Sequence, residues 1–358
     1  MSDAAAAPAV RVRKPIKTET LLGFALLGLA AGAVIASFFA GPKSFTQIMV
    51  IGISNGAVFA LIALGYTMVY GIIELINFAH GDLFMLGAVF SSIFLEEWLN
   101  QTRSGLTGWA LLGLTLVVAM IFCACLNMLI EFLAYRRLRN APKLAPLITA
   151  VGVSFILQNL GIVFNGSAPK SRKSVLPQGG IMIGSIEIKI KYMIVLVVTI
   201  PLLLLMTYIV QKTKTGKAMR ATAQDRDASL LMGINVDRII AITFALGGAL
   251  AGAAGTLFAQ VNGRTSYDLG FRLGLIAFTA AVLGGVGNLP GAVLGGFLIG
   301  LIQAFNDGAP RFRVPGLPFR FDVPFGQEWT QTVLFGILII MIIFRPGGIF
   351  GKVQQEKV

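Results

Sequence analysis

Seven long apolar runs constrain the fold of this chain more than any other feature of its sequence. A helix needs about 20 apolar residues to cross the roughly 30 Å hydrocarbon core of a bilayer, and most of the runs approach or exceed that length. Apolar residues make up 56% of the 358 residues and charged residues only 13%, which leaves too little polar surface to cover a soluble globule. We therefore expect an all-α protein, a polytopic membrane helical bundle. The runs are Leu21–Phe39, Ile48–Leu64, Trp109–Leu133, Leu147–Val163, Tyr192–Val210, Ile239–Ala259 and Thr330–Phe344.

Three shorter apolar segments add to the count of spans. Leu83–Leu95, Gly274–Val286 and Ala292–Phe305 are each near or below spanning length and are bounded by glycine, proline or charge. With these segments we predict about ten spans. A membrane β-barrel would instead alternate apolar and polar residues in segments of about ten, whereas these runs are apolar on all faces.

Lysine and arginine near the span ends predict the orientation, because positive residues are retained on the cytoplasmic side of a membrane. With about ten spans, both basic termini and the basic loops 136–143 and 212–238 fall inside. Two other basic loops, 170–191 and 311–320, fall outside and fit the rule poorly. We accept that misfit, because moving them inward would strand the other basic segments outside.

The same pattern predicts the organisation of the chain. Residues 1–20 are expected to form a disordered basic cytoplasmic lead, residues 21–350 the transmembrane domain and residues 351–358 a cytoplasmic tail. The net charge of +13 is mostly a topology signal, since the basic residues are scattered between spans instead of forming one patch for nucleic acid.

The sequence offers little chemistry for an enzyme or a metal site. Cys123 and Cys125 lie mid-span two residues apart, on different sides of a helix, and His80 is the only histidine. No Gly-x-x-x-x-Gly-Lys-Ser/Thr loop occurs, so ATP hydrolysis by this chain alone is not expected. We predict no catalytic residue, no metal and no cofactor.

Glycines four residues apart predict close helix packing. Gly248 and Gly252, Gly291 and Gly295, and Gly296 and Gly300 each have the small-x-x-x-small spacing that lets helix backbones approach one another in lipid.

Two regions depart from the apolar pattern, one in each half of the chain. Gly65–Asp82 combines glycines with polar side chains, and Leu283–Gly295 contains several glycines and Pro290. We expect interrupted helices at both places, because freed backbone groups are tolerated only where they face protein or a wet cavity. Such breaks commonly flank the substrate path of transporters. The predicted path residues are Asn55, Tyr66, Tyr70, Asn77 and His80.

Structural alternatives remain open for the polar residues in this part of the membrane. His80 is either a functional group at membrane depth or a residue at the cytoplasmic interface that caps a helix or bonds a neighbouring carbonyl. Hydrogen bonding between helices explains Asn55, Gln158 and Asn159 as readily as substrate contact does.

A longer stretch of residues carries a resemblance to a known family. Residues 52–81, with Ile76-Asn77-Phe78-Ala79-His80-Gly81 near their end, resemble the inner-membrane permease subunit of branched-chain amino acid ABC importers of the Liv type. The likeness continues through Arg220–Gly255 and Phe278–Ala292 and covers most of residues 45–350. It implies a bacterial multi-pass inner-membrane permease that works by alternating access. It also implies a second, homologous permease subunit, two cytoplasmic ATP-binding subunits and a periplasmic substrate-binding protein as partners, with no nucleic acid.

The same resemblance implies a coupling loop. The Glu-Ala-Ala-x-x-x-Gly loop of ABC importers docks on the ATPase, and Asp227-Ala228-Ser229-Leu230-Leu231-Met232-Gly233 is similar to it in spacing. The residues implied are Asp227, Ala228, Ser229 and Gly233. Gly233 can end a short helix in a left-handed conformation, and Leu230, Leu231 and Met232 offer an apolar ridge to a groove. An ordinary amphipathic surface helix between spans is the alternative.

The substrate and two other classes of function stay open. Similar permeases serve urea, short amides or aromatic acids, so these compete with branched-chain amino acids. An ion-coupled secondary transporter would usually need buried carboxylates, and Glu74, Asp82 and Glu131 are expected near span ends. A membrane enzyme would need a cluster of acid, base or nucleophile residues, and the sequence has none. The sequence also leaves open whether the permease pairs with a copy of itself or with a different chain.

Overall fold

The structure is a computed structural model that describes residues 42–73, 77–98, 106–139, 141–142, 144–172, 174–177, 179–183, 186–308, 326–345 and 347–351. The predicted lead 1–20, the predicted span Leu21–Phe39, Glu74 and nearly all of the tail 351–358 lie outside the described residues.

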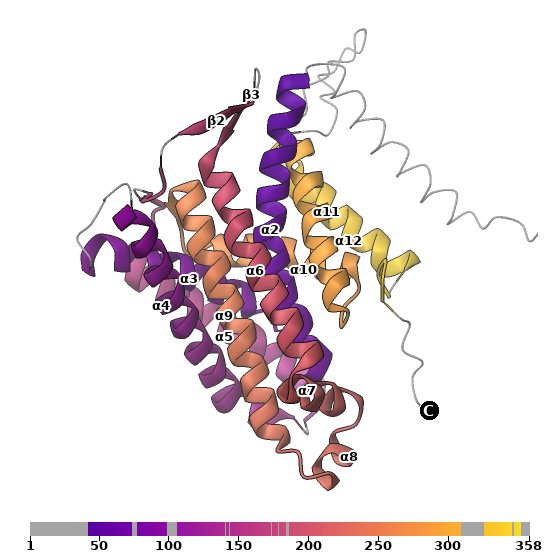
Figure 1. Cartoon of the computed structure of the whole chain (residues 1–358). Coiled ribbons are helices and arrows are strands. Elements are labelled where there is room, and N and C mark those ends of the chain that lie inside the picture. Colours follow the sequence, from indigo (N-terminus) through magenta and orange to yellow (C-terminus); the bar gives the residue numbers. More distant parts are fainter. Residues whose placement is uncertain are drawn as a thin grey trace, which may run out of the picture. The chain divides into compact units, whose positions relative to one another are not determined.

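Helices dominate the described residues, as the apolar runs predict (Figure 1). The α-helices are α2 (Pro42–Ile73), α3 (His80–Ile93), α4 (Leu106–Ile130), α5 (Leu144–Asn165), α6 (Ile190–Lys212), α7 (Lys214–Gln224), α8 (Arg226–Leu231), α9 (Val236–Asn262), α10 (Leu269–Gly284), α11 (Leu289–Gly308) and α12 (Thr330–Phe344). Short π and 3-10 helices, η1 (Phe94–Trp98), η2 (Glu131–Tyr135) and η3 (Arg136–Leu138), extend α3 and α4.

Four short strands in the described part of the chain form two antiparallel pairs. β1 (Lys170–Ser171) pairs with β4 (Arg264–Thr265), and β2 (Gly180–Ile183) forms a hairpin with β3 (Ile186–Lys189). These strands lie in the segments between helices. The described residues therefore form the helical bundle that the sequence predicts.

Within the described ranges, six helices are long and apolar enough to span a membrane, so the prediction of about ten spans is not confirmed. The six are Phe45–Ile73, Gly108–Leu138, Leu144–Asn165, Ile190–Lys212, Val236–Asn262 and Leu289–Gly308. The predicted segment Ala292–Phe305 is longer than expected, because its helix begins at Leu289 and ends at Gly308. Conversely, α12 has the predicted bounds but only 15 residues, and α3 and α10 are similarly short.

Burial separates inner from outer helices. The apolar windows of α2 and α9 are 67% and 78% buried, whereas those of the α4 and α5 segments are both 22% buried. The outer helices carry large exposed apolar side chains, such as Ile121 on α4 and Ile148 on α5. Such a surface is stable in lipid, since the tails of lipids are as apolar as the side chains.

Glycines bring neighbouring helices into backbone contact, as their spacing predicts. A Cβ atom on Gly252 would meet the carbonyl of Ala119 on α4, and one on Gly248 would meet the carbonyl of Cys123 one turn further along α4. Gly296 and Gly300 of α11 lie against α2 in the same way, and Gly291 and Gly295 lie against α10. Cys123 is buried as expected for a packing residue, whereas Cys125 is exposed on α4.

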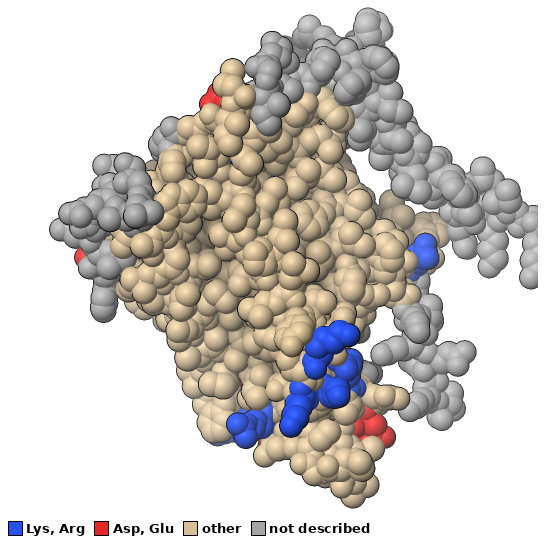
Figure 2. Space-filling view, in the orientation of Figure 1, with Lys and Arg blue, Asp and Glu red and all other residues tan. Residues whose placement is uncertain are grey.

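The loops divide between two ends of the bundle (Figure 1). The β2–β3 hairpin lies at the end where α2 starts, and α7 and α8 lie at the opposite end. Figure 2 shows most of the visible Lys and Arg side chains gathered toward the α7 and α8 end, where Lys212, Lys214, Lys217 and Arg220 are exposed. Arg139, from the other loop predicted to be cytoplasmic, pairs with Asp237 at this same end.

The predicted interruptions are confirmed in both halves of the chain. In the first half, α2 continues through Gly65 to Ile73, and residues 77–79 form a non-helical turn before α3, so the interruption lies inside the predicted region Gly65–Asp82. α3 begins at His80, directly after this turn. In the second half, α10 ends at Gly284 and α11 starts at Leu289, inside the predicted region.

The turn after α12 packs against the break between α10 and α11 and forms hydrogen bonds with the end of α10. Gly285 has a φ of 106°, which an L side chain rarely adopts. The amides of Ile349 and Phe350 donate to the carbonyls of Leu283 and Gly284 at 2.8 and 3.2 Å. The orphan carbonyls at the end of α10 are therefore partly paired with protein instead of facing an open cavity.

Candidate functional site

Tyr66 and His80 meet in the interior, where α2 passes the start of α3. Their ring centroids are 4.7 Å apart in an edge-on arrangement, and the Phe278 ring of α10 lies 6.0 Å from the Tyr66 ring. His80 is fully buried within the chain. Gly65 makes this contact possible, because a Cβ atom there would collide with the His80 imidazole.

Several buried polar atoms around this contact have no hydrogen-bond partner among the described residues. They include both ring nitrogens of His80, although the backbone of Ile62 lies beside the ring, together with Asp82 Oδ1. Buried polar groups are normally paired, and each exception calls for a physical explanation such as strain, water or function. Comparable unpaired atoms also occur elsewhere in the described residues, for example on Asn127 and Thr199.

Asn77 has a structural role at the same junction. Its Oδ1 accepts hydrogen bonds from the backbone amide of Ala79 at 3.1 Å and from the Tyr135 hydroxyl at 2.9 Å. The first bond closes the turn that leads into α3, and the second ties that turn to η2.

Asn55 and Tyr70 lie on the same helix as Tyr66 but do not join the Tyr66–His80 contact. Residues 55, 66 and 70 share one face of α2, because steps of eleven and four residues both return close to the same side of a helix. Asn55 lies about 16 Å along the axis from Tyr66, at 1.5 Å per residue. Both Asn55 and Tyr70 are half-buried, whereas Tyr66 is buried.

Asp82 is a buried carboxylate, and the sequence interpretation placed it simply near a span end. It is 1% exposed at the start of α3, and Ser154 Oγ of α5 donates to its Oδ2. Gln158 donates in turn to Ser154 Oγ at 3.1 Å. The sequence predicts a polar Gln158 inside the bundle, but the link from Ser154 to Asp82 spans 72 positions and has no local signal.

The predicted coupling residues form a short capped helix at the α7 and α8 end. Asp225, which the sequence interpretation did not single out, is the N-cap of α8, because its side chain accepts from the amide of Ala228 at 2.9 Å. Asp227 lies in the first turn of α8, where a negative charge interacts favourably with the helix dipole. Ser229 is buried and its hydroxyl donates to the carbonyl of Asp225 at 2.7 Å.

Gly233 ends this helix in the left-handed conformation that the sequence predicts. Its φ is 79°, and the amide of Ile234 returns to the carbonyl of Ser229 at 3.0 Å. This is the hydrogen-bond pattern of a Schellman C-cap, which favours glycine.

An apolar ridge, defined here as Leu230, Leu231 and Met232, lies on the outer side of α8 and its C-terminal end. Its side chains are 56%, 89% and 82% exposed. α8 lies at the tip of the molecule in Figure 1, and its neighbouring segments are rich in charge. Contiguous exposed apolar side chains beside polar ones mark interaction sites more often than free surface.

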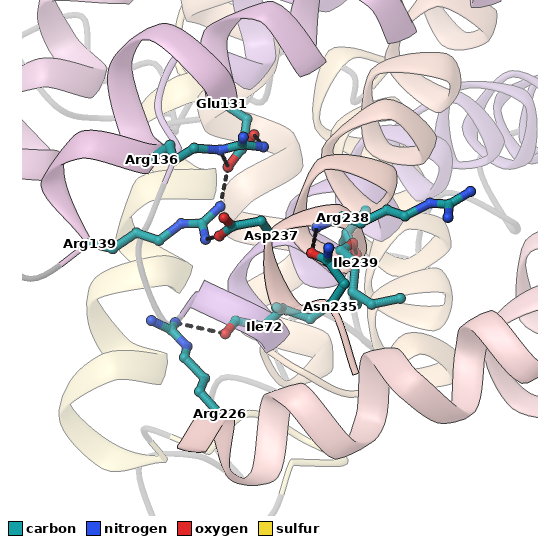
Figure 3. Close-up of polar contacts among 10 residues, drawn as sticks. Ile72, Glu131, Arg136, Arg139, Arg226, Asn235, Asp237, Arg238 and Ile239 are labelled. Atoms are coloured by element: carbon teal, nitrogen blue, oxygen red, sulfur yellow. Dashed lines mark hydrogen bonds and ion pairs between the residues drawn. The ribbon is translucent and has the colours of Figure 1, made fainter. Parts of the chain in front are cut away.

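Ion pairs hold the base of this region to the bundle (Figure 3). Arg139 pairs with both Glu131 of η2 and Asp237 in the first turn of α9, and Arg136 donates to Glu131 at 3.1 Å. Glu131 is fully buried, and the two arginines compensate its charge. Arg226, at the first position of α8, donates to the carbonyl of Ile72 at 2.9 Å.

Comparison with known proteins decides the family. Residues 48–343 match the family described as the branched-chain amino acid transport system permease component. The chain belongs to this family of permeases. The expected resemblance is therefore confirmed, and the chain is a membrane-embedded transport permease.

Related permeases match along nearly their full length. The high-affinity branched-chain amino acid transport system permease protein BraD of Pseudomonas aeruginosa is 39% identical over 321 residues, which cover 88% of this chain and 98% of BraD. The permease protein LivH of Escherichia coli K12, from a system of the same description, is 36% identical over 319 residues, again 88% of this chain and 98% of LivH. The autoinducer 2 import system permease protein LsrC of Photorhabdus laumondii is 27% identical over 166 residues, 44% of this chain and 45% of LsrC. The likeness to branched-chain amino acid permeases is thus both closer and longer.

Proposed function

We propose that this permease is the inner-membrane subunit of an ABC importer and forms the translocation path for branched-chain amino acids by alternating access. The family match and the near full-length likeness to BraD and LivH support the substrate class. The observation that carries the coupling to a separate motor is the exposed apolar ridge on α8. Leu231 and Met232 have little reason to be exposed on a capped helix unless a partner covers them.

The partners that we propose are a second homologous permease subunit, two cytoplasmic ATP-binding subunits and a periplasmic substrate-binding protein. α8 would insert its ridge into a groove of an ATP-binding subunit, with Asp227, Ala228, Ser229 and Gly233 as the coupling loop. An amphipathic helix docks by laying its apolar face into a groove, and the ridge supplies that face.

The topology that we propose has about ten spans, with both termini in the cytoplasm. The six long helices, the three shorter ones α3, α10 and α12, and Leu21–Phe39 would make up that count. The α7 and α8 end is cytoplasmic in this proposal, because exposed lysine and arginine gather there. The transmembrane permease domain would be 21–350, between the lead 1–20 and the tail 351–358.

For the substrate path we propose the face of α2 that carries Asn55, Tyr66 and Tyr70. The half-buried Asn55 and Tyr70 leave this face partly open in the single chain, as a path between two permease subunits requires. Asn77 and His80 would support the path from behind, since both are buried at the junction with α3.

The experiment is ATP-driven uptake of labelled leucine into vesicles that hold this chain with its partner permease, ATP-binding subunits and binding protein. Urea and a short amide serve as competitors. Leucine uptake that stops without ATP is the expected result. Uptake of a competitor instead of leucine would change the substrate, and uptake driven by an ion gradient without ATP would replace the importer with a secondary transporter.

A further inference from the structure

Arg226 joins α8 directly to the end of α2. Its guanidinium Nη2 donates to the carbonyl of Ile72 at 2.9 Å, across 154 positions of sequence (Figure 3). The last four carbonyls of a helix lack partners within the helix and form the negative end of its dipole. Arg226 therefore caps α2 with a charged donor while it occupies the first position of α8.

We propose that Arg226 is a positioning residue that transmits displacement of α8 to the contact between Tyr66 and His80. The inference rests on the proposed function, because it assigns the path by which a motor docked on α8 would act on the interior of the permease.

The path runs along a single rigid element. α2 is continuous from Tyr66 to Ile72, a distance of about 9 Å along the axis at 1.5 Å per residue. A pull or rotation at Ile72 therefore moves Tyr66 with little loss. Tyr66 bears on His80, which fits a notch between Gly65 and Gly247 and leaves both ring nitrogens unpaired among the described residues. The ring lies beside the backbone of Ile62 and can exchange that neighbour for others when Tyr66 moves, so this contact is suited to two arrangements.

A pocket beside Arg226, half open to the outside, gives the end of α2 room to move. It has a volume of about 290 Å³ and is bounded by Arg226, Ile72, Ile73, Tyr135, Arg139 and Ile240, among others. Close-packed interiors resist displacement, whereas a space of this size next to the link allows it. Tyr135 also donates to Asn77, so the same cavity adjoins the turn that leads into α3.

Ion pairs anchor the start of α9, which follows α8 in the chain. A force on α8 is therefore directed toward α2. Asp237, just beyond α8, is paired with Arg139, which also pairs with buried Glu131. Gly233 lies between this anchor and α8 with positive φ and with open space where a side chain would be. α8 is thus followed by a glycine and an anchored helix start, and its Arg226 side chain reaches α2.

The test compares Arg226→Met with Arg226→Lys in the complete transporter and measures the substrate molecules imported per ATP hydrolysed. Methionine keeps an apolar stem and removes every donor, and we expect the ratio to fall about tenfold. A tenfold loss corresponds to about 1.4 kcal/mol, close to the net contribution of one hydrogen bond to a charged group. Lysine restores a charged donor and should recover part of the ratio. A merely structural role would lower import and ATP hydrolysis together and leave their ratio unchanged.

Arg238→Met is the matched control. Arg238 is exposed on the first turn of α9, and its side chain points away from the cluster in Figure 3. The ratio for this variant should equal that of the wild type. If Arg226→Met does not assemble with its partners, Arg226→Gln takes its place, since it keeps a polar side chain but is too short and uncharged to replace the guanidinium.

The outcomes separate this inference from the proposed function. A wild-type complex that imports nothing with ATP contradicts the proposed function. A wild-type complex that imports normally, together with an unchanged ratio in Arg226→Met or its glutamine replacement, overturns the inference alone. A lowered ratio in Arg238→Met as large as that in Arg226→Met would also overturn it, because loss of any positive charge would then suffice.

Discussion

Replacing both Leu231 and Met232 with alanine should separate the permease from its ATP-binding subunits while leaving its fold intact. These two side chains are 89% and 82% exposed. Their removal costs almost nothing in the free energy of unfolding, because little of their surface is buried in the folded chain. The whole effect should therefore fall on the interface with a partner.

The magnitude depends on the apolar surface that docking would bury. Alanine removes about three heavy atoms from each side chain, and at about 0.8 kcal/mol for each buried methylene the loss is about 2 kcal/mol per residue. Each single substitution should thus weaken docking by about 30-fold. The double variant should lose more than either single one, although neighbouring residues are not fully additive.

The assay is the affinity of the ATP-binding subunits for the purified permease pair, together with the stimulation of their ATPase activity by loaded binding protein. Leu204→Ala is the matched control, because Leu204 is 65% exposed on α6, within a candidate membrane span. The affinity of the ATP-binding subunits for this variant should equal that for the wild type. Normal affinity and stimulation in the double variant would refute the docking role of the ridge.

Three glycine substitutions test other parts of the structure. Gly65→Ala should lower transport by at least tenfold with the complex assembled, because the new Cβ atom would displace the histidine ring opposite; uptake at the wild-type rate would contradict the role of that contact. Gly252→Ala should lower the thermal unfolding temperature in detergent by several degrees, since a methyl group would meet backbone across the helix pair. For both, Gly113→Ala is the control, as a Cβ atom there has open space. Gly233→Ala also has space, so it should cost only about 1 kcal/mol of left-handed backbone strain and reduce ATPase stimulation modestly; an effect as large as that of the ridge variants would mean that its backbone itself docks.

The sequence predicts the parts of this structure that depend on local spacing. The apolar runs predict the helices, and the spacing of Gly248 and Gly252 predicts a close contact that the structure confirms. The position of Gly233 after a short charged segment predicts its left-handed conformation. In each case the physical cause acts within one or two helical turns.

Interactions between distant segments could not be predicted in the same way. Nothing near Arg226 indicates that it would cap a helix 154 positions earlier, and Ser154 gives no sign of its bond to Asp82. Gly65 shows a second difficulty. A glycine that weakens a helix and a glycine that admits a neighbouring ring look alike in sequence, and here the second use, the accommodation of His80, is the real one.

The tight seating of α9 between α3 and α4 also sets how freely this protein can diverge. Gly248 and Gly252 face the backbone of α4, and Gly255 faces the carbonyl of Phe84 on α3, so even one added methyl group forces two helices apart. The exposed apolar positions of α5, such as Ile148, face no such wall. Over evolutionary time the small residues of α9 should be strongly conserved, while the outward face of α5 should vary among the apolar side chains that lipid accepts.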